Sequence, residues 1–284
     1  MFTKMQFGFI PHLLTALLAG SLLLSACSPA VSATTLPTPT ATSAPMATVE
    51  PTATMAPAAT VIPTTDGSLH LSLDFSSMAT GFQTETVAAV PASDNAPFWE
   101  VLPEYTKVTL QGYPISNHLM KPQIFIYPVK DIGKVNEGAG KIVASLQTLL
   151  QSPQEIPNMP FLPLFNASQV MHVHTQYLDF KNGQGLRYLT EFDQGMMPIN
   201  NNELIYTYQG LTSDGKYYVA AVLPVNHPSL PADGKVTGNE PPEFTSDFPT
   251  YLANVVKTLN PQAANTFTPD LTQLDAMMNS LEIK

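Results

Sequence analysis

The chain has 284 residues, and its 12 Lys and Arg against 22 Asp and Glu give a formal net charge of −10. Only 12% of the residues are charged, against about a quarter in an ordinary soluble protein. Nucleic-acid binding depends on clustered Lys and Arg, which an acidic chain of this kind lacks. We therefore exclude nucleic acid as a partner.

The first 26 residues have the layout of a secretory signal peptide. Lys4 is followed by a stretch from Phe7 to Ala26 that contains no charged residue and is rich in leucine. A positively charged lead, an apolar core and small residues at its end are typical of such signals. The apolar stretch also has about the length needed to cross a bilayer, about 20 residues, so a retained transmembrane anchor is the alternative.

Leu24-Ser25-Ala26-Cys27 ends this segment, and Cys27 is the only cysteine in the chain. These four residues resemble the lipobox of bacterial lipoproteins, Leu-[Ala/Ser]-[Gly/Ala]-Cys, at every position. The resemblance implies that Cys27 receives a diacylglyceryl group and that the signal peptide is cut off just before it. Two acyl chains anchor a protein stably in a membrane, whereas one does so only marginally. The alternative is a buried or reactive free thiol.

Residues 28–65 predict a disordered tether. Proline, threonine, alanine and serine dominate this stretch, and Glu50 is its only charged residue. So little bulky apolar surface cannot offset the entropy lost on ordering the backbone. The proline content favours an extended, semi-rigid spacer. We therefore divide the chain into a signal peptide at 1–26, a disordered tether with lipidated Cys27 at 27–65, and a single globular domain at 66–284.

Alternation of apolar residues predicts mostly strands in the globular domain. Every second residue of the segment 68–75 is apolar, as in a strand with one buried face. Two β-hairpins are expected at 168–192 and 203–225, and Asp214-Gly215 supplies the positive φ values of a tight turn in the second. Further strands are expected at 81–90, 107–113 and 123–129.

Three helices are expected from apolar residues at helical spacing, at 135–150, at 247–259 and after residue 268. The third has Thr268 as its expected N-cap and Pro269 at its first position. Strands paired by hairpins, with helices segregated in sequence, predict an α+β fold. We expect a mostly antiparallel sheet flanked by about three helices and preceded by the disordered linker.

The order of these elements is similar to that of the α/β/α sandwich of PsbP and Mog1. The resemblance rests on one helix after QIFIYPV, two hairpins, and a closing helix that reads LDAMMNSLEI. It implies a non-catalytic domain, as in the known members of that family. The tract 167–231, with FKNGQGLRYLT and YQGLTSDGKYYVAAVLPVNHP, also resembles an uncharacterised family of bacterial exported proteins, which implies no activity.

His172 and His174 are the first candidates for a metal site. They lie two residues apart on an expected strand, so both side chains are expected on one face. His-x-His on a strand is typical of some zinc sites, and Glu191 or Asp193 on the partner strand is the candidate third ligand. A slip of one residue in register places both carboxylates on the other face. The alternative is a solvated or hydrogen-bonded pair of histidines, with Glu191 and Asp193 on a solvent-exposed edge.

Two further features have alternative interpretations. The tyrosines of the second hairpin suit a stacking platform for sugars or peptides, but cross-strand pairing also accounts for them. The proline-rich apolar segment 156–165 is either a partner-binding patch or a cover for the core, and we favour the cover. No nucleophile elbow or phosphate-binding loop occurs in the sequence.

These observations lead us to expect a surface lipoprotein on the outer face of the bacterial cytoplasmic membrane or in the outer membrane. Its domain is expected to bind or scaffold without catalysis and without a cofactor. The expected partners are the lipid bilayer, through the diacylglycerol on Cys27, and an envelope protein or an extracellular ligand. The alternative function is an extracytoplasmic metal-binding protein or hydrolase that uses His172 and His174.

Overall fold

The computed structural model describes residues 60–62 and 69–284. The expected signal peptide, Cys27 and most of the expected tether lie outside the described residues. Within the tether range, Thr60–Ile62 forms a short strand, β1, so regular structure begins before residue 66. No helix in the described part of the chain is both long enough and apolar enough to cross a membrane.

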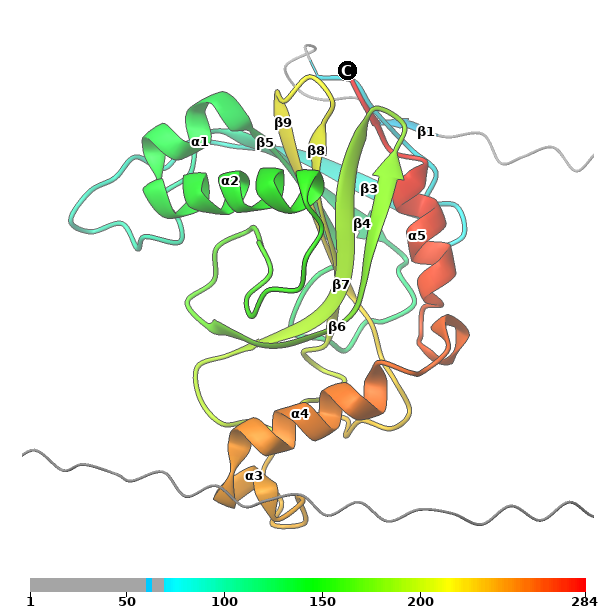
Figure 1. Ribbon diagram of the computed structural model, residues 1–284. Helices are drawn as coiled ribbons and strands as arrows, with labels where there is room; N and C mark the ends of the chain where they lie inside the picture. Colours follow the sequence, from blue (N-terminus) through cyan, green and yellow to red (C-terminus); the bar gives the residue numbers. More distant parts are fainter. Residues whose placement is uncertain (1–59, 63–68) are drawn as a thin grey trace, which may run out of the picture. The chain divides into compact units, whose positions relative to one another are not determined.

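The main sheet has seven strands in the order β3-β4-β5-β9-β8-β7-β6, and every neighbouring pair is antiparallel (Figure 1). Both expected hairpins are confirmed, as β6 with β7 and β8 with β9. The strands are β3 Gly81–Val87, β4 Tyr105–Gln111, β5 Gln123–Pro128, β6 Ser168–Phe180, β7 Gly183–Asp193, β8 Ile205–Thr212 and β9 Tyr217–Pro224.

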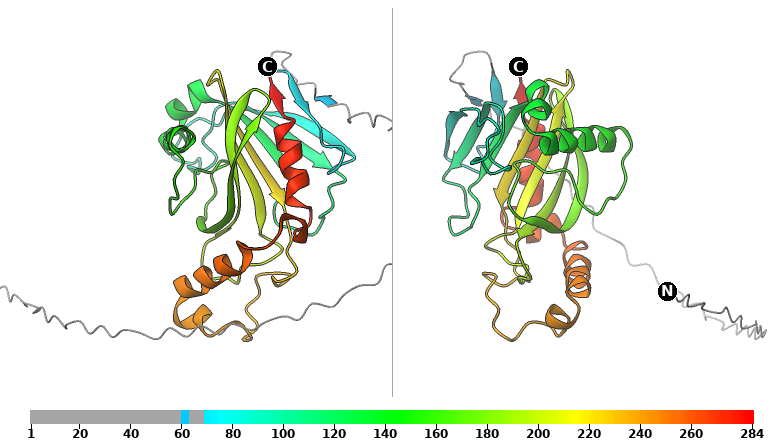
Figure 2. Two further views of the ribbon diagram at one scale, coloured as in Figure 1. Left: turned by 45° about the vertical axis from the view of Figure 1, so that its right-hand side comes forward. Right: turned by 90° about the vertical axis from the view of Figure 1, so that its left-hand side faces the viewer.

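Helices cover both faces of this sheet, so the α+β expectation is confirmed. In Figure 2 (left) α1 and α2 lie on one side of the sheet and α5 lies on the other. Five α-helices occur in the described residues, more than the three expected. They are α1 Val129–Val135, α2 Glu137–Gln151, α3 Glu243–Ser246, α4 Phe248–Leu259 and α5 Leu271–Asn279, with a 3-10 turn at Ala264–Thr266.

A second, three-stranded sheet packs with the α5 side of the core. The expected strand at 68–75 is shorter than predicted, because only Leu71–Leu73 forms β2. This strand lies between β1 and β10, Glu282–Ile283, at the C-terminal end of the chain. Leu71 and Leu73 are fully buried, and each such side chain contributes about 1.5 to 3 kcal/mol when it leaves water.

The two faces of the main sheet form separate hydrophobic clusters. Every residue of β8 is buried, because helices or loops cover both faces of this central strand. Tyr206 and Tyr208 belong to the cluster under α5, and Tyr218 belongs to the cluster under α2. All three rings are fully buried, so they are core residues and not an exposed stacking platform.

The segment 156–165 covers the core, as expected. Met159, Phe161 and Leu162 are buried in the α2-side cluster. Gln209 on β8 fixes the segment from below, because its side-chain amide accepts from the Leu162 N–H at 3.0 Å and donates to the Leu162 carbonyl at 3.0 Å. Two backbone groups that would otherwise be buried without partners are thereby satisfied.

Two local predictions need correction. The last helix begins at Leu271, and its N-cap is Asp270, whose carboxylate accepts from the Thr272 N–H at 2.8 Å. Thr268 lies outside the helix and instead forms an isolated bridge with Asn226. In the turn of the second hairpin only Gly215 has a positive φ, 69°, so Asp214 does not adopt the expected conformation. The turn spans residues 213–216, between the end of β8 and the start of β9.

Candidate functional site

The two candidate histidines lie on β6, at the edge of the main sheet. His172 pairs with Thr190 of β7, and a β-bulge interrupts the register between Val173 and Gln176. His174 lies in this bulge with φ 55°, in the left-handed region that non-glycine residues rarely adopt. The extra residue reorients the strand, so the alternation that placed both histidines on one face no longer holds.

The side chains of the two histidines consequently face different layers. The His172 ring lies 6.3 Å from the Tyr188 ring in the α2-side cluster, and its Nε2 is 3.3 Å from a carboxylate oxygen of Glu155. The His174 ring lies 5.0 Å from the Phe267 ring in the α5-side cluster, and its Nε2 is 2.9 Å from the Leu259 carbonyl. The prediction that both share one face is wrong.

Glu191, the third residue of the expected metal site, lies in a different group. Its ligand atoms cluster with those of Asp193 and Glu203, all within 4.8 Å of one another. Among the described residues this is the only group of three or more His, Cys, Asp or Glu side chains placed to share a metal ion. His172 and His174 do line one cavity of about 400 Å³, together with Glu155, but Glu191 lies outside it. The expected site of His172, His174 and Glu191 is therefore not assembled.

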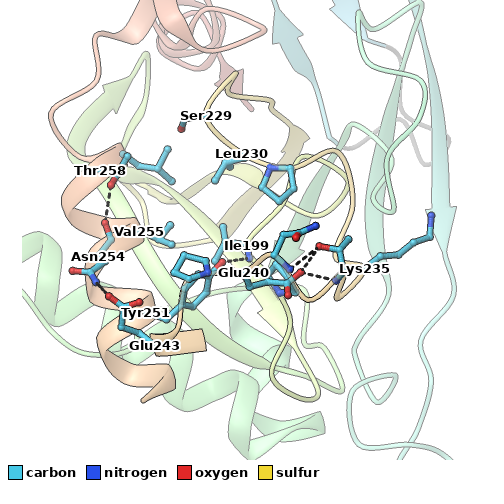
Figure 3. Close-up of a pocket in the computed structure, with 16 residues that line it drawn as sticks. Ile199, Ser229, Leu230, Lys235, Glu240, Glu243, Tyr251, Asn254, Val255 and Thr258 are labelled. Atoms are coloured by element: carbon cyan, nitrogen blue, oxygen red, sulfur yellow. Dashed lines mark hydrogen bonds between the residues drawn. The ribbon is translucent and has the colours of Figure 1, made fainter. Parts of the chain in front are cut away.

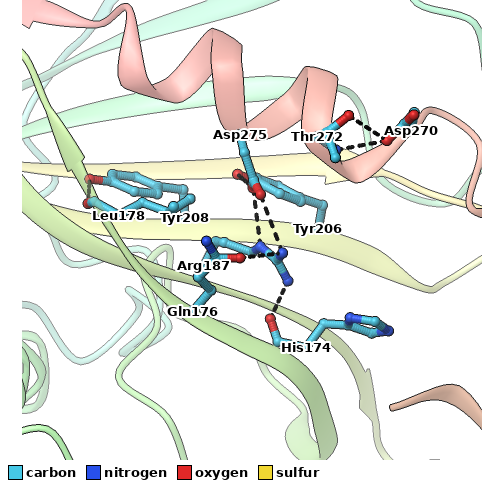
Figure 4. Close-up of polar contacts among 9 residues, drawn as sticks. All are labelled: His174, Gln176, Leu178, Arg187, Tyr206, Tyr208, Asp270, Thr272 and Asp275. Carbon is cyan, nitrogen blue, oxygen red and sulfur yellow. Dashed lines mark hydrogen bonds and ion pairs between the residues drawn. The ribbon is translucent and has the colours of Figure 1, made fainter. Parts of the chain in front are cut away.

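Arg187 explains the bulge beside the histidines (Figure 4). Arg187 is the only arginine in the sequence, and its side chain is buried. Its guanidinium donates a hydrogen bond to the backbone carbonyl of His174. The same group donates to the Gln176 side chain at 2.8 Å and forms a two-point ion pair with Asp275 of α5. Tyr206 completes the network by donating its hydroxyl to Asp275 at 3.0 Å. All these groups hold strands and helix together, so we assign them a structural role.

A cavity of about 500 Å³ lies between α4 and the loop that joins β9 to α3 (Figure 3). Its walls are mainly apolar, and this volume is typical of sites for small molecules. Three separate segments supply the lining. The principal apolar residues are Ile199, Leu230, Val255 and Leu259, with Pro198, Pro231 and Pro241.

The charged residues at the rim of this cavity already have partners. Glu240 accepts from the backbone N–H groups of Thr237 at 2.6 Å and Gly238 at 2.9 Å. Lys235 forms an ion pair at 2.6 Å with Asp233, a residue that does not itself line the cavity. These charges shape the loop itself and leave the apolar walls as the surface open to a ligand.

Tyr251 of α4 is the central polar group of the cavity wall. Its hydroxyl oxygen accepts from the Ile199 N–H at 2.9 Å, which leaves the hydroxyl proton for donation. Burial raises the pKa of Tyr251, and the nearby carboxylates of Glu191, Glu240 and Asp193 raise it further. The phenol is therefore neutral at ordinary pH and acts as a hydrogen-bond donor.

The carboxylate cluster lies behind the same wall. Glu191 is fully buried, not on a solvent-exposed edge, and Asp193 is 5% exposed. Burial raises the pKa of Glu191 to about 9, against the lowering effect of the hydrogen bonds from Asn200. Burial, followed by the charge of Glu203, raises the pKa of Asp193 to about 7. The prediction that Glu191 and Asp193 lie on a solvent-exposed edge is wrong, because the chain that follows β7 folds back over the end of this strand.

Sequence reasoning missed the cavity, although one signal was present. The loop at 225–242 has no regular secondary structure, and structureless loops longer than about 12 to 15 residues are commonly functional. Glu203 carries no comparable signal, because it follows three asparagines in a turn and is brought to Glu191 and Asp193 only by the return of the chain.

Fold and site together define an α+β domain on an open, fully antiparallel sheet, with an apolar cavity at one end and buried carboxylates behind it. No protein-family model, curated protein or solved structure matches the chain.

Proposed function

We propose that the protein is a membrane-anchored surface lipoprotein whose domain binds a small, largely apolar ligand without catalysis. The cavity between α4 and the 225–242 loop is the observation that carries the binding function. The lipobox-like sequence that ends at Cys27 supports the anchor and the export of the chain. A bilayer partner, through diacylglycerol on Cys27, and an extracellular ligand or envelope protein complete this proposal.

The chemistry of the lining favours a neutral or weakly polar ligand. Ile199, Leu230 and Val255 supply apolar contact, and burying such surface is the main source of affinity in sites of this size. Tyr251 supplies one hydrogen-bond donor that orients the ligand. Ser229 lines the cavity, and its hydroxyl lies 2.7 Å from Nδ1 of His227. The other ring nitrogen of His227 faces the Thr266 hydroxyl at 3.1 Å and not a carboxylate, so the pair lacks the acid of a catalytic triad and the arrangement suits binding and release more than turnover.

The neutral fluorescent probe N-phenyl-1-naphthylamine tests the cavity. We expect the probe to bind the domain with increased fluorescence, and Val255→Trp to weaken binding at least tenfold by filling the cavity. Ala253→Trp is the matched control, because Ala253 is exposed on the same helix and does not line the cavity. Absence of binding, or equal loss in both variants, contradicts the proposed ligand site.

The likeness to the PsbP and Mog1 sandwich also becomes part of this proposal. Helices on both faces of an antiparallel sheet, and a closing helix at Leu271–Asn279, support it. The relevant comparison is strand order and connection, not sequence. A strand order in that family other than β3-β4-β5-β9-β8-β7-β6 would end the likeness without affecting the cavity.

A further inference from the structure

We propose that Glu191, Asp193 and Glu203 bind a hard divalent cation, with Ca²⁺ as the best fit. The ligand atoms of the three carboxylates lie within 4.8 Å of one another. Oxygen ligands of Ca²⁺ lie roughly 2.3 to 2.6 Å from the ion, so two oxygens on the same ion are at most about 5 Å apart. The three groups therefore already have the separation that a shared Ca²⁺ requires.

An unpartnered oxygen in the cluster is the second observation. Asp193 is 5% exposed, and its buried Oδ2 receives no hydrogen bond from any donor group of the described residues. The only polar neighbour of the Asp193 carboxyl within hydrogen-bond reach that is found there is the carboxyl of Glu203, another acid. A buried carboxylate oxygen without a donor is costly, and native structures rarely retain one unless an ion or water satisfies it. A cation held between Asp193 and its two carboxylate neighbours supplies the missing partner.

Asn200 orients Glu191 for this role. The Asn200 N–H donates to one oxygen of Glu191 at 3.1 Å, and the Asn200 side-chain amide donates to the other at 3.0 Å. Both carboxylate oxygens thus accept a hydrogen bond, so Asn200 fixes the plane of the Glu191 carboxyl group. Supporting hydrogen bonds of this kind fix the direction of ligands at metal sites. The free lone pairs of Glu191 remain available to an ion.

Compensating positive charge is absent from the protein around the cluster. Across the described ranges, no Lys, Arg or His nitrogen lies within ion-pair distance of these three carboxylates. Buried carboxylates need a counter-charge or protons. The all-oxygen set, without histidine or cysteine, selects Ca²⁺, Mg²⁺ or Mn²⁺ over zinc. Ca²⁺ tolerates irregular geometry and is therefore the best candidate.

The cation site stands independently of the proposed ligand, although the two are neighbours. Asn200 directly follows Ile199, which lines the cavity and donates its N–H to Tyr251. A cation bound by both Glu191 and Glu203 would join the two ends of the segment 191–203, which contains Ile199 and Asn200. Binding of Ca²⁺ is therefore expected to stabilise the cavity floor.

Thermal unfolding of the chelator-treated full chain, with and without added Ca²⁺, tests the site. At a Ca²⁺ concentration about 100 times the Kd, we expect the Tm to rise by about 5 to 10 °C. Isothermal titration calorimetry is expected to give one Ca²⁺ per chain. Mg²⁺ and Mn²⁺ are titrated in parallel, and a response to either one alone still supports a hard-cation site.

Two variants locate the binding. Asp193→Asn and Glu203→Gln are expected to lose the Ca²⁺-dependent shift, and Glu203 is the safer position because it is only partly buried. Asp179→Asn is the matched control, an exposed carboxylate on the same hairpin, and is expected to keep the full shift. No heat and no shift with any of the three ions overturns the proposal. A shift that survives in Glu203→Gln and Asp193→Asn overturns it as well.

Discussion

Arg187 and Asp275 form a buried two-point ion pair between β7 and α5. The Arg187 Nε lies 3.1 Å from Asp275 Oδ1, and the Arg187 Nη2 lies 3.2 Å from Asp275 Oδ2. The same guanidinium donates to the His174 carbonyl, so one side chain joins the closing helix to the bulge of the edge strand. A charge placed here holds three elements in register that are far apart in the sequence.

Loss of Asp275 is expected to destabilise the domain strongly. Asp275→Ala leaves the Arg187 charge buried without its partner, and we expect the free energy of unfolding to fall by about 3 to 5 kcal/mol. Urea denaturation measures this change. Glu137→Gln, which breaks the exposed pair with Lys141 on α2, is the control and is expected to leave the midpoint unchanged. Equal effects of the two substitutions would contradict the structural role of Arg187.

Stability of the metal-free protein is expected to depend on pH through the carboxylate cluster. The pKa values of Glu191, about 9, and Asp193, about 7, lie above the ordinary values of these side chains, 4.5 and 3.8. At each pH between the ordinary and the raised pKa of these two groups, the folded state therefore binds more protons than the unfolded state. It follows that the free energy of unfolding falls as the pH rises from about 5 to about 9.

Chemical denaturation in the presence of chelator, at several pH values, measures this dependence. Asp193→Asn removes one titrating group and is expected to flatten the part of the curve near pH 7. Asp179→Asn serves again as the control, because Asp179 is exposed and lies outside the cluster. Stability that rises between pH 5 and pH 9 would show that the carboxylates are not held protonated in the metal-free fold.

The cover of the α2-side core is expected to depend on Gln209. Gln209→Ala leaves the Leu162 N–H and carbonyl without partners and also removes the acceptor of the Tyr218 hydroxyl. Leaving these groups unsatisfied is expected to cost about 2 to 4 kcal/mol. Limited proteolysis should then cut within 156–165 faster than in the parent. Gln184→Ala, at an exposed position of β7, is expected to cause neither change.

Cys27→Ser tests the anchor. A diacylglyceryl group on the sulfur adds apolar surface that holds the chain to a membrane. The serine variant is therefore expected to lose the lipid and its normal processing, and to leave the membrane fraction. Mass spectrometry of the mature parent protein is expected to show lipid on Cys27 and loss of residues 1–26. An unmodified thiol with the initiator methionine in place would contradict the lipoprotein proposal.

The local pattern of apolar and polar residues in the sequence was sufficient to predict much of the fold. Apolar spacing placed α2 and α4 to within two residues, and alternation around short turns placed both hairpins. These features are encoded by neighbours in the chain, so sequence alone reveals them. The third helix was misplaced because a second capping residue, Asp270, lies two positions after Thr268 and competes for the same role.

Sequence alone determined the acidic balance, the lipobox-like segment at Cys27 and the antiparallel, hairpin-built domain, because each depends on residues close together in the chain. Tertiary structure decided the sites. Arg187 and Asp275 hold the bulge that turns His174 away from His172. The return of the chain after β7 buries Glu191 and brings Glu203 to it. Such long-range contacts determine how deeply a carboxylate is buried. Burial in turn decides whether the group is solvated at the surface or needs a proton or a cation as its partner.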